Sequence, residues 1–427
     1  MARLLLLVPT TSYRAPDFMA AAARLGVEVI VGCEAAQPAA PLSAGGLVAV
    51  DFRNPNRGIA QIADLDAARP LDAIVGVDDA SVPIAARAAA ALGLPHNPPA
   101  AVAASGDKHA FRRALAAAGL PTPPFRRLGL GADPAAAARR APYPCVLKPL
   151  ALSASRGVIR ADDAAGFVAA FARIATLLRR PEVAAGLGRL GQAILVEGFI
   201  PGREVALEGL LVAGRLHVLA LFDKPDPLDG PFFEETLYVT PARLAPEARE
   251  AVAAMARRTV AALGLREGPV HAEFRLNAAG VWPIEMAARS IGGLCSRTLR
   301  FATGLALEDL ILRRALGETA PPPPPLEGAA GVMMIPIPAS GRLVRVDGIE
   351  QARAVPGIED VRITVRIGQV LVPWPEGDRY LGFVFARGDD PDTVEAALRA
   401  AHARLSFAIE SVAEAIDASR RRTETAP

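Results

Sequence analysis

The sequence predicts a mixed fold, α/β at its N-terminus and α+β behind it. Over the first 100 residues, short and almost wholly apolar runs alternate with helical stretches. Apolar strands spaced by helices are typical of a parallel sheet that is covered on both faces. Between about 193 and 290 the apolar runs instead follow one another through tight turns, which indicates antiparallel strands.

The size and charge of the chain limit what it can be. With 427 residues, 52% of them hydrophobic and 22% charged, it is globular and long enough for two to four domains. A net charge of +2 gives no electrostatic reason to expect nucleic acid or an anionic membrane as a partner. No apolar run approaches the roughly 20 residues of a membrane span, and the opening apolar run is typical of a buried strand. We therefore expect a cytoplasmic protein.

Residues 1–100 are predicted to form a Rossmann-like domain. Its expected strands are Leu4–Val8, Val27–Val31, Leu47–Val50 and Ala73–Val77. Its expected helices are Pro16–Leu25, Ile59–Ala68 and Ser81–Leu92. The first strand is not followed by the glycine-rich fingerprint of dinucleotide-binding proteins, so this domain need not bind a dinucleotide.

Three further domains are predicted along the chain. Residues 101–190 contain two helices and the strand Cys145–Lys148, and residues 191–325 contain an antiparallel sheet and the helix Pro246–Leu263. The expected strands of that sheet are Ile194–Glu197, Glu204–Val212, Arg215–Leu221 and Leu237–Thr240. Prolines 321–325 favour an extended linker to a last domain, 326–427, with short strands, one helix at Pro391–Ser406 and a disordered tail after about 417.

A hairpin centred near Ala279 is the most informative segment. Alternation along its strands places one set of side chains on a core face: Ala272, Phe274, Leu276, Trp282, Ile284 and Met286. The other face carries His271, Glu273, Arg275, Pro283 and Glu285. In this register Glu273 and Glu285 are opposed, with Cβ atoms roughly 5 Å apart. Two carboxylates so placed suit Mg²⁺, although a solvated face with a Glu273–Arg275 surface pair is the alternative.

Other charged residues stand where an anion could bind. Arg289 precedes the small residues Gly292 and Gly293, and a guanidinium can hold a carboxylate or phosphate through two parallel hydrogen bonds. Lys148 ends an apolar strand, where its ammonium needs water or an anion. The loop after it offers backbone N–H groups and side-chain donors that could surround phosphates: Ser153, Ser155, Arg156 and Gly157. A surface arginine and an ordinary solvated turn are the respective alternatives.

Two acidic residues flank a turn that follows the strand Ile194–Glu197. Glu197 and Glu204 could accept hydrogen bonds from ribose hydroxyls or an adenine amino group, and exposed surface acids are the alternative. Farther along, in the segment 223–235, Glu234 or Glu235 could receive the ammonium of a substrate, and a surface acid is the alternative for each.

Taken in order, these pieces resemble the ATP-grasp superfamily. The pieces are Asp107-Lys108, Lys148-Pro149, the Ser/Gly loop, Val196-Glu197-Gly-Phe, Gly202-Arg-Glu204, His271-x-Glu273 and Glu285-x-x-x-Arg289. The resemblance covers residues 1 to about 320, and the remainder is similar to the extra C-terminal domain of the L-amino acid ligase branch. It implies an ATP-grasp architecture in which two α+β subdomains clamp the nucleotide.

The resemblance also implies roles for single residues. Lys108 and Lys148 would contact ATP phosphates, whereas Glu197, Phe199 and Glu204 would line the adenosine site. Metal binding (Mg²⁺, or Mn²⁺ in its place) would fall to Glu273 and Glu285. Arg289 would hold the acyl phosphate or substrate carboxylate, with His271 beside the reacting group. Ala287 stands where many members have a metal-binding asparagine, and the phosphate loop has few glycines, so this chain departs from the pattern at two points.

The activity implied is that of an ADP-forming carboxylate–amine ligase. A small carboxylate such as an amino acid would be activated as an acyl phosphate and passed to an amine, in a protein that forms a homodimer. One alternative is a biotin carboxylase-like enzyme that activates bicarbonate. A catalytically silent ATP-binding regulatory protein is another, which the Glu273/Glu285 pair argues against.

Overall fold

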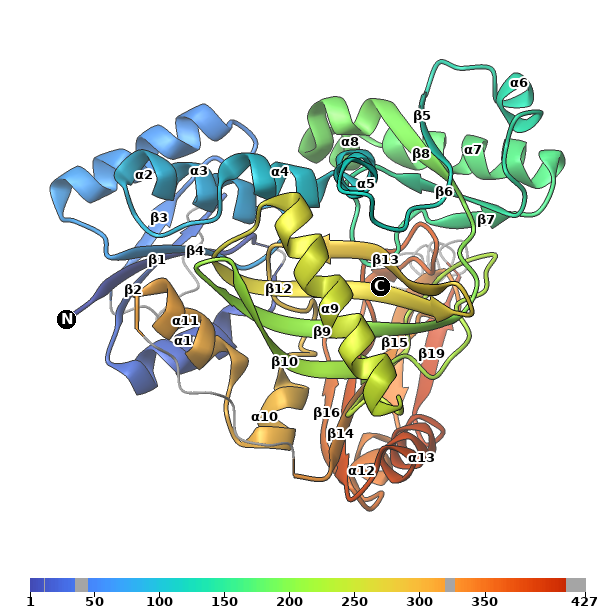
Figure 1. The fold of residues 1–427 in the computed structure, drawn as a ribbon. Helices are drawn as coiled ribbons and strands as arrows, with labels where there is room; N and C mark the ends of the chain where they lie inside the picture. Colours follow the sequence, from blue (N-terminus) through green and yellow to red (C-terminus); the bar gives the residue numbers. More distant parts are fainter. Residues whose placement is uncertain (11, 35–44, 319–326, 412–427) are drawn as a thin grey trace, which may run out of the picture.

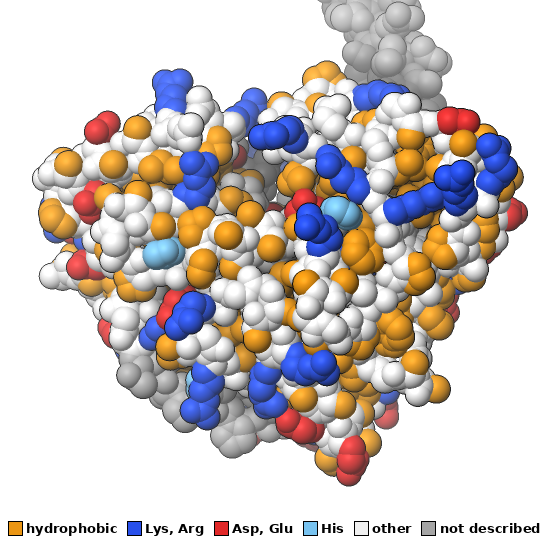
Figure 2. All heavy atoms as spheres, turned by 45° about the horizontal axis from the view of Figure 1, so that its top comes forward, with side chains coloured by type: hydrophobic (Ala, Val, Ile, Leu, Met, Phe, Trp, Pro, Cys, Tyr) orange, Lys and Arg blue, Asp and Glu red, His pale blue; other side chains and the backbone are white. Residues whose placement is uncertain are grey.

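The computed structural model describes residues 1–10, 12–34, 45–318 and 327–411. The predicted linker at 321–325 and the predicted tail after 417 lie outside these ranges. The described residues form four sheets, which are arranged with their helices as Figure 1 shows. Among the helices of the described ranges, none combines the length and apolar character needed to cross a bilayer. On the face shown in Figure 2, charged side chains are interspersed with hydrophobic ones.

The N-terminal unit is the predicted parallel sheet, with strand order β3-β2-β1-β4. Its strands are β1 (Arg3–Leu7), β2 (Glu28–Cys33), β3 (Leu47–Ala49) and β4 (Ala73–Gly76). Its helices are α1 (Ala15–Leu25), α2 (Pro55–Ala68) and α3 (Val82–Leu92), followed by α4 (Pro99–Gly106). Because β1 and β4 are adjacent and parallel, the segments after their carboxyl ends open at one edge of the sheet.

A second, antiparallel sheet has the order β5-β8-β6-β7. Its strands are β5 (Phe125–Gly129), β6 (Cys145–Pro149), β7 (Ile159–Ala161) and β8 (Ala193–Gly198). Helix α5 (Lys108–Ala117) precedes it, and α6 (Pro134–Ala138), α7 (Ala164–Leu178), α8 (Pro181–Leu187) and a 3₁₀ turn at Gly188–Gln192 lie within it in sequence. Strand β8 belongs to this sheet, although the sequence division at 190/191 assigned it to the following unit.

The central sheet has eight strands in the order β13-β12-β9-β10-β11-β14-β18-β16. Five of them come from the middle of the chain: β9 (Arg203–Val212), β10 (Arg215–Asp223), β11 (Leu237–Thr240), β12 (Gly268–Asn277) and β13 (Gly280–Ala287). Helix α9 (Pro246–Leu263) packs its apolar residues on one face (Figure 1). The other face packs against α1, α10 (Arg297–Thr303) and α11 (Leu307–Ala315).

The remaining three strands of the central sheet come from the last part of the chain. This part is therefore not a separate unit, because it shares a sheet with the middle of the chain. They are β14 (Ala329–Ile335), β16 (Ile358–Ile363) and β18 (Gly382–Gly388). A separate small sheet has the order β17-β15-β19, from β15 (Gly341–Asp347), β17 (Val370–Leu371) and β19 (Ser406–Glu410). The prediction of a single helix here is wrong, since α12 (Ile349–Arg353) accompanies α13 (Pro391–His402).

The hairpin of β12 and β13 has the predicted pairing, with Glu273 directly opposite Glu285. A register shift between Glu273 and Phe274 then places Pro283 opposite Phe274 and Trp282 opposite Arg275. The predicted faces of Trp282, Pro283 and Ile284 are therefore wrong. An extra residue in one strand reverses the alternation on its far side, which strict alternation cannot anticipate.

Candidate active site

A cavity of about 400 Å³ lies where the N-terminal sheet, the second sheet and the central sheet meet. The segments after β1 and β4, the loop after β6, the end of β8, and strands β12 and β13 contribute to its walls, together with Asp378–Tyr380 from the C-terminal part. Eleven of the thirteen predicted site residues line it: Lys108, Lys148, Ser153, Ser155, Glu197, Phe199, Glu204, His271, Glu273, Glu285 and Arg289. Residues up to 181 positions apart in the sequence thus line one cavity.

The two predicted phosphate-binding lysines hold carboxylates in this structure. Lys148 Nζ lies 2.5 Å from Glu197 Oε1, and Lys108 Nζ lies 3.2 Å from Glu285 Oε2. Arg112, which was not among the predicted site residues, donates to Glu197 Oε2 at 2.7 Å. Although burial opposes ionisation, Arg112 and Lys148 lower the pKa of Glu197 to about 2. Glu197 is therefore a charged anchor that fixes Lys148 at the cavity wall.

Phe199 follows β8 and lies between two guanidinium groups. Arg160 is 4.3 Å and Arg275 5.1 Å from its ring centroid. Its backbone N–H donates to Pro144 O at 2.9 Å. The ring is thus held in place as part of the cavity wall, next to Glu197 and Gly198.

The phosphate loop, residues 150–158, divides into two parts. Ser153, Ala154 and Ser155 line the cavity. Arg156 and Gly157, both predicted to bind ATP, are not part of its lining. The Arg156 guanidinium donates to Glu376 O at 2.9 Å, and the Gly157 N–H donates to Pro375 O at 2.7 Å. Both residues are directed to the C-terminal part of the chain, whose proximity no local sequence pattern indicated.

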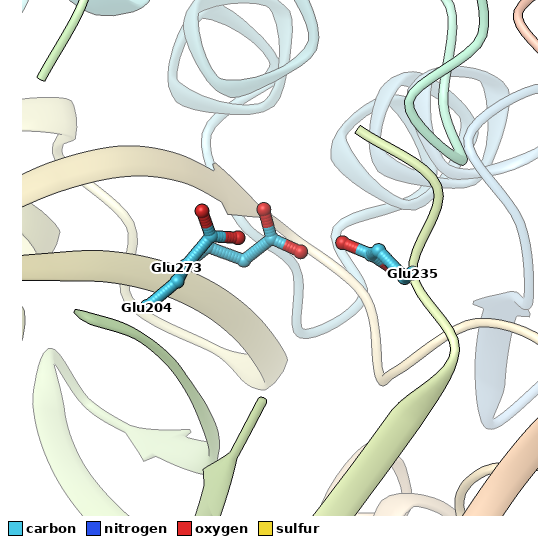
Figure 3. A group of neighbouring side chains, drawn as sticks. All are labelled: Glu204, Glu235 and Glu273. Atoms are coloured by element: carbon cyan, nitrogen blue, oxygen red, sulfur yellow. The ribbon is translucent and has the colours of Figure 1, made fainter. Parts of the chain in front are cut away.

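Glu204 is engaged by two cations, and it belongs to a group of three carboxylates. Glu204, Glu235 and Glu273 place carboxylate oxygens within 4.8 Å of one another. Figure 3 shows that Glu204 and Glu273, on neighbouring strands, point toward Glu235. The ammonium of Lys224 joins all three, at 2.7, 2.6 and 3.0 Å respectively. Glu204 also accepts from Arg275 at 2.8 Å.

One ammonium faces three carboxylates in this group, and the Arg275 guanidinium beside Glu204 and the His271 ring beside Glu273 supply further positive charge. Burial and the neighbouring charge of Glu273 raise the pKa of Glu235, whereas Lys224 and His271 outweigh burial and lower the pKa of Glu273. Lys224 occupies the middle of the trio, so a metal ion there would have to displace it. Glu273 and Glu285 instead face the cavity from opposed strands, and their oxygen donors fit Mg²⁺.

His271 joins Glu273 to a second buried carboxylate. Its Nδ1 lies 3.2 Å from Glu208 Oε2, and its Nε2 lies 3.7 Å from Glu273 Oε1. Burial alone would lower the pKa of His271, but the two carboxylates raise it to about 9. The ring is therefore a cation at neutral pH, and it stabilises the ionised form of Glu273.

Arg289 forms a two-point ion pair with Asp79, and both residues line the cavity. Its Nε and Nη2 donate to the two carboxylate oxygens of Asp79, both at 2.8 Å. Although burial opposes it, Arg289 lowers the pKa of Asp79. Arg289 thus holds the carboxylate of Asp79 in this structure, and its role toward a substrate carboxylate or acyl phosphate stays a prediction. Asp78 and Asp79 follow β4 at the open edge of the parallel sheet, a position that could have identified them from the sequence.

We expect Glu234→Gln to stabilise the protein at high pH. One carboxylate oxygen of Glu234 is buried without a hydrogen-bond partner, and burial raises the pKa from its ordinary 4.5 to about 7. Between these two values the folded state binds more protons than the unfolded state, so the wild type loses stability as the pH rises from about 4.5 to about 7. Glutamine does not ionise, and because the side chain is only half buried we expect a gain of about 1 kcal/mol.

Urea unfolding at pH 5 and pH 8.5 measures this difference. The advantage of Glu234→Gln over wild type should be larger at pH 8.5 than at pH 5. Glu359→Gln, at an exposed position of β16, is the matched control and should shift the two midpoints equally. A Glu234→Gln effect that does not depend on pH would contradict the prediction.

Three family models match the chain. They are an ATP-grasp N-terminal domain at residues 19–96, an ATP-grasp domain at 141–298 and the L-amino acid ligase C-terminal domain 2 at 333–410. Among solved structures, an L-amino acid ligase from Bacillus licheniformis superposes with a TM-score of 0.84 at 28% identity, covering 96% of this chain and 99% of that one. The fold and order of units are therefore those of an ATP-grasp protein, and the ATP-grasp domain implies that ATP binds.

Two curated relatives match this chain over only part of their own length. An uncharacterized protein of Sinorhizobium fredii is 26% identical over 329 residues, which are 76% of this chain and 66% of that protein. An alanine–anticapsin ligase of Bacillus subtilis is 26% identical over 257 residues, which are 56% of this chain and 53% of that ligase. The chain thus spans between about half and two thirds of these relatives.

Proposed function

We propose that this chain, which belongs to the ATP-grasp superfamily, uses ATP to join the carboxylate of an amino acid to an amine. One observation carries the proposal: the lysines, the opposed glutamates and the arginine that such a reaction needs line a single cavity. The match of residues 333–410 to the L-amino acid ligase C-terminal domain supports an amino acid as the carboxylate substrate.

In the first step, a carboxylate oxygen of the substrate attacks the γ-phosphorus of ATP, and the bond to the β-phosphate oxygen breaks to release ADP. Lys108 and Lys148 neutralise charge on the phosphates. Glu273 and Glu285 would hold Mg²⁺, which would offset negative charge on the phosphates. Arg289 exchanges Asp79 for the substrate carboxylate or its acyl phosphate, because both present two oxygens to the same pair of N–H groups.

In the second step, the amine nitrogen attacks the acyl carbon, phosphate leaves with the electron pair of the C–O bond, and the nitrogen loses a proton. The amine attacks in its neutral form. Glu235, whose pKa is raised by burial and by Glu273, lines the cavity and can accept the proton that the nitrogen loses as the amide forms. The protein otherwise orients the reactants and excludes water, which would hydrolyse the acyl phosphate.

Phosphate release measured over pairs of amino acids, with mass spectrometry of the products, tests this function. We expect ADP and phosphate in equal amounts with an amide product, and dependence on Mg²⁺ or Mn²⁺. Release that requires bicarbonate and biotin instead of an amino acid would replace the proposal by the carboxylase alternative. ATP binding without turnover on any pair would favour the silent regulatory protein.

A further inference from the structure

The phosphate loop contains two residues in an unfavourable backbone conformation. Ala154 and Ser155 have φ angles of 54° and 52°, in the left-handed region. Residues with a Cβ atom avoid this region because the Cβ atom crowds the backbone, and they remain there only where surrounding contacts hold them. Both residues line the cavity at the place proposed for the ATP phosphates. The contacts that hold them are therefore part of the binding site.

Those contacts come from the segment 374–378 of the C-terminal part, which lies some 220 residues away in the sequence. The indole N–H of Trp374 donates to Ala154 O at 2.7 Å. The N–H of Gly157 donates to Pro375 O at 2.7 Å, and Arg156 Nε donates to Glu376 O at 2.9 Å. Three hydrogen bonds thus fix the loop on both sides of Ser155.

The segment 374–378 is itself held at Trp374 and at Glu376. Trp374 is 7% exposed, stacks on Tyr380 at a centroid distance of 4.6 Å, and belongs to the apolar cluster beneath the central sheet. The Glu376 carboxylate accepts two hydrogen bonds from Arg173 of helix α7, one of them at 2.8 Å. The segment therefore connects the central sheet to the subdomain that carries the phosphate loop.

We propose that Trp374, with the Glu376–Arg173 ion pair, is a positioning residue for the phosphate loop, and so that the C-terminal part of the chain contributes to ATP binding. The loop presents Ser153–Ser155 to the polyphosphate only in the shape that these contacts impose. This inference rests on the proposed function for the identity of the ligand. In addition, Trp374, Glu376 and Arg173 need not contact the nucleotide. They determine the affinity for the phosphates of ATP and not the affinity for its adenosine.

Trp374→Phe tests the proposal because it removes the indole N–H and keeps an aromatic ring against Tyr380. One hydrogen bond is worth about 1 kcal/mol, so we expect the Kd for a non-hydrolysable ATP analogue to rise about fivefold. The Kd for adenosine should not change. Calorimetry on the full chain gives both values. The matched control is Trp282→Phe, which removes the indole hydrogen bond of 3.2 Å to Asn277 at the hairpin tip, outside the cavity lining.

The ion pair provides an independent second test. Arg173→Glu should weaken binding of the ATP analogue, and adding Glu376→Arg should restore it, with adenosine binding constant throughout. Equal losses for analogue and adenosine, or no loss with either Trp374→Phe or Arg173→Glu, would overturn the proposal. Failure of the proposed function is distinguishable, since it appears as the absence of ligation by the wild type while nucleotide binding is still measured.

Discussion

Replacing Glu285 with glutamine should reduce amino-acid-dependent phosphate release at least about 100-fold, because a charge that stabilises the transition state is lost. Glu285 faces Glu273 across the hairpin and lines the cavity, where the pair is proposed to hold Mg²⁺. Its side chain is 32% exposed and forms an ion pair with Lys108, so we expect the fold to tolerate the loss of its charge. The Mg²⁺ concentration at half-maximal rate should rise as well.

A steady-state assay over a range of Mg²⁺ concentrations measures both effects. Glu250→Gln serves as the control, because Glu250 lies on α9 in an exposed ion pair with Arg257. It should leave the rate and the Mg²⁺ dependence unchanged. Near-normal turnover by Glu285→Gln at wild-type Mg²⁺ concentrations would remove the metal assignment.

Arg289→Lys should lower kcat/KM for the carboxylate substrate by about 10- to 100-fold and leave KM for ATP nearly unchanged. Lysine keeps the charge but cannot donate the two parallel N–H bonds that now reach Asp79. One hydrogen bond to a charged group contributes about 1.5–3 kcal/mol, which is the expected loss.

The matched control is Arg297→Lys. Arg297 makes the same two-point contact to Asp17, at 2.9 and 3.0 Å, but it is not part of the cavity lining. We expect this variant to show no selective loss in kcat/KM for the carboxylate. Arg289→Lys and Arg297→Lys with the same kinetic constants would contradict a substrate-binding role for Arg289.

Local patterns predicted the elements of this fold well. The strands β1, β2 and β4 and the helices α1, α3 and α9 lie within two residues of their predicted positions. The spacing of their apolar residues is visible within each short segment, so these elements can be predicted without knowledge of the tertiary structure. The opposition of Glu273 and Glu285 was predicted for a turn centred near Ala279. The observed turn instead pairs Asn277 with Gly280, and the bulge beside Glu273 compensates for this difference of one residue.

What escaped prediction depends on residues that are distant in sequence. Arg112 and Asp79 carry no local signal for the partners Glu197 and Arg289 that they contact 85 and 210 positions away. Lys224 directly follows β10, and Lys148 lies near the end of β6, so the argument made for Lys148 could also have identified Lys224. The bulge beside Glu273 and the pairing of β14 with β11 are likewise decided by packing across the sheet, which no window of the sequence contains.

That last pairing determines how the molecule can be cut. A chain that stopped near residue 328 would uncover the hydrogen-bonding edge of Leu237–Thr240, whose partners are Ala330–Met333. It would also expose apolar side chains of β11 that now pack against the last part of the chain. An uncovered strand edge of this kind invites pairing between molecules. The last 100 residues therefore cannot be treated as a detachable module, and exchanges between related ligases should keep β11 and β14 from the same parent.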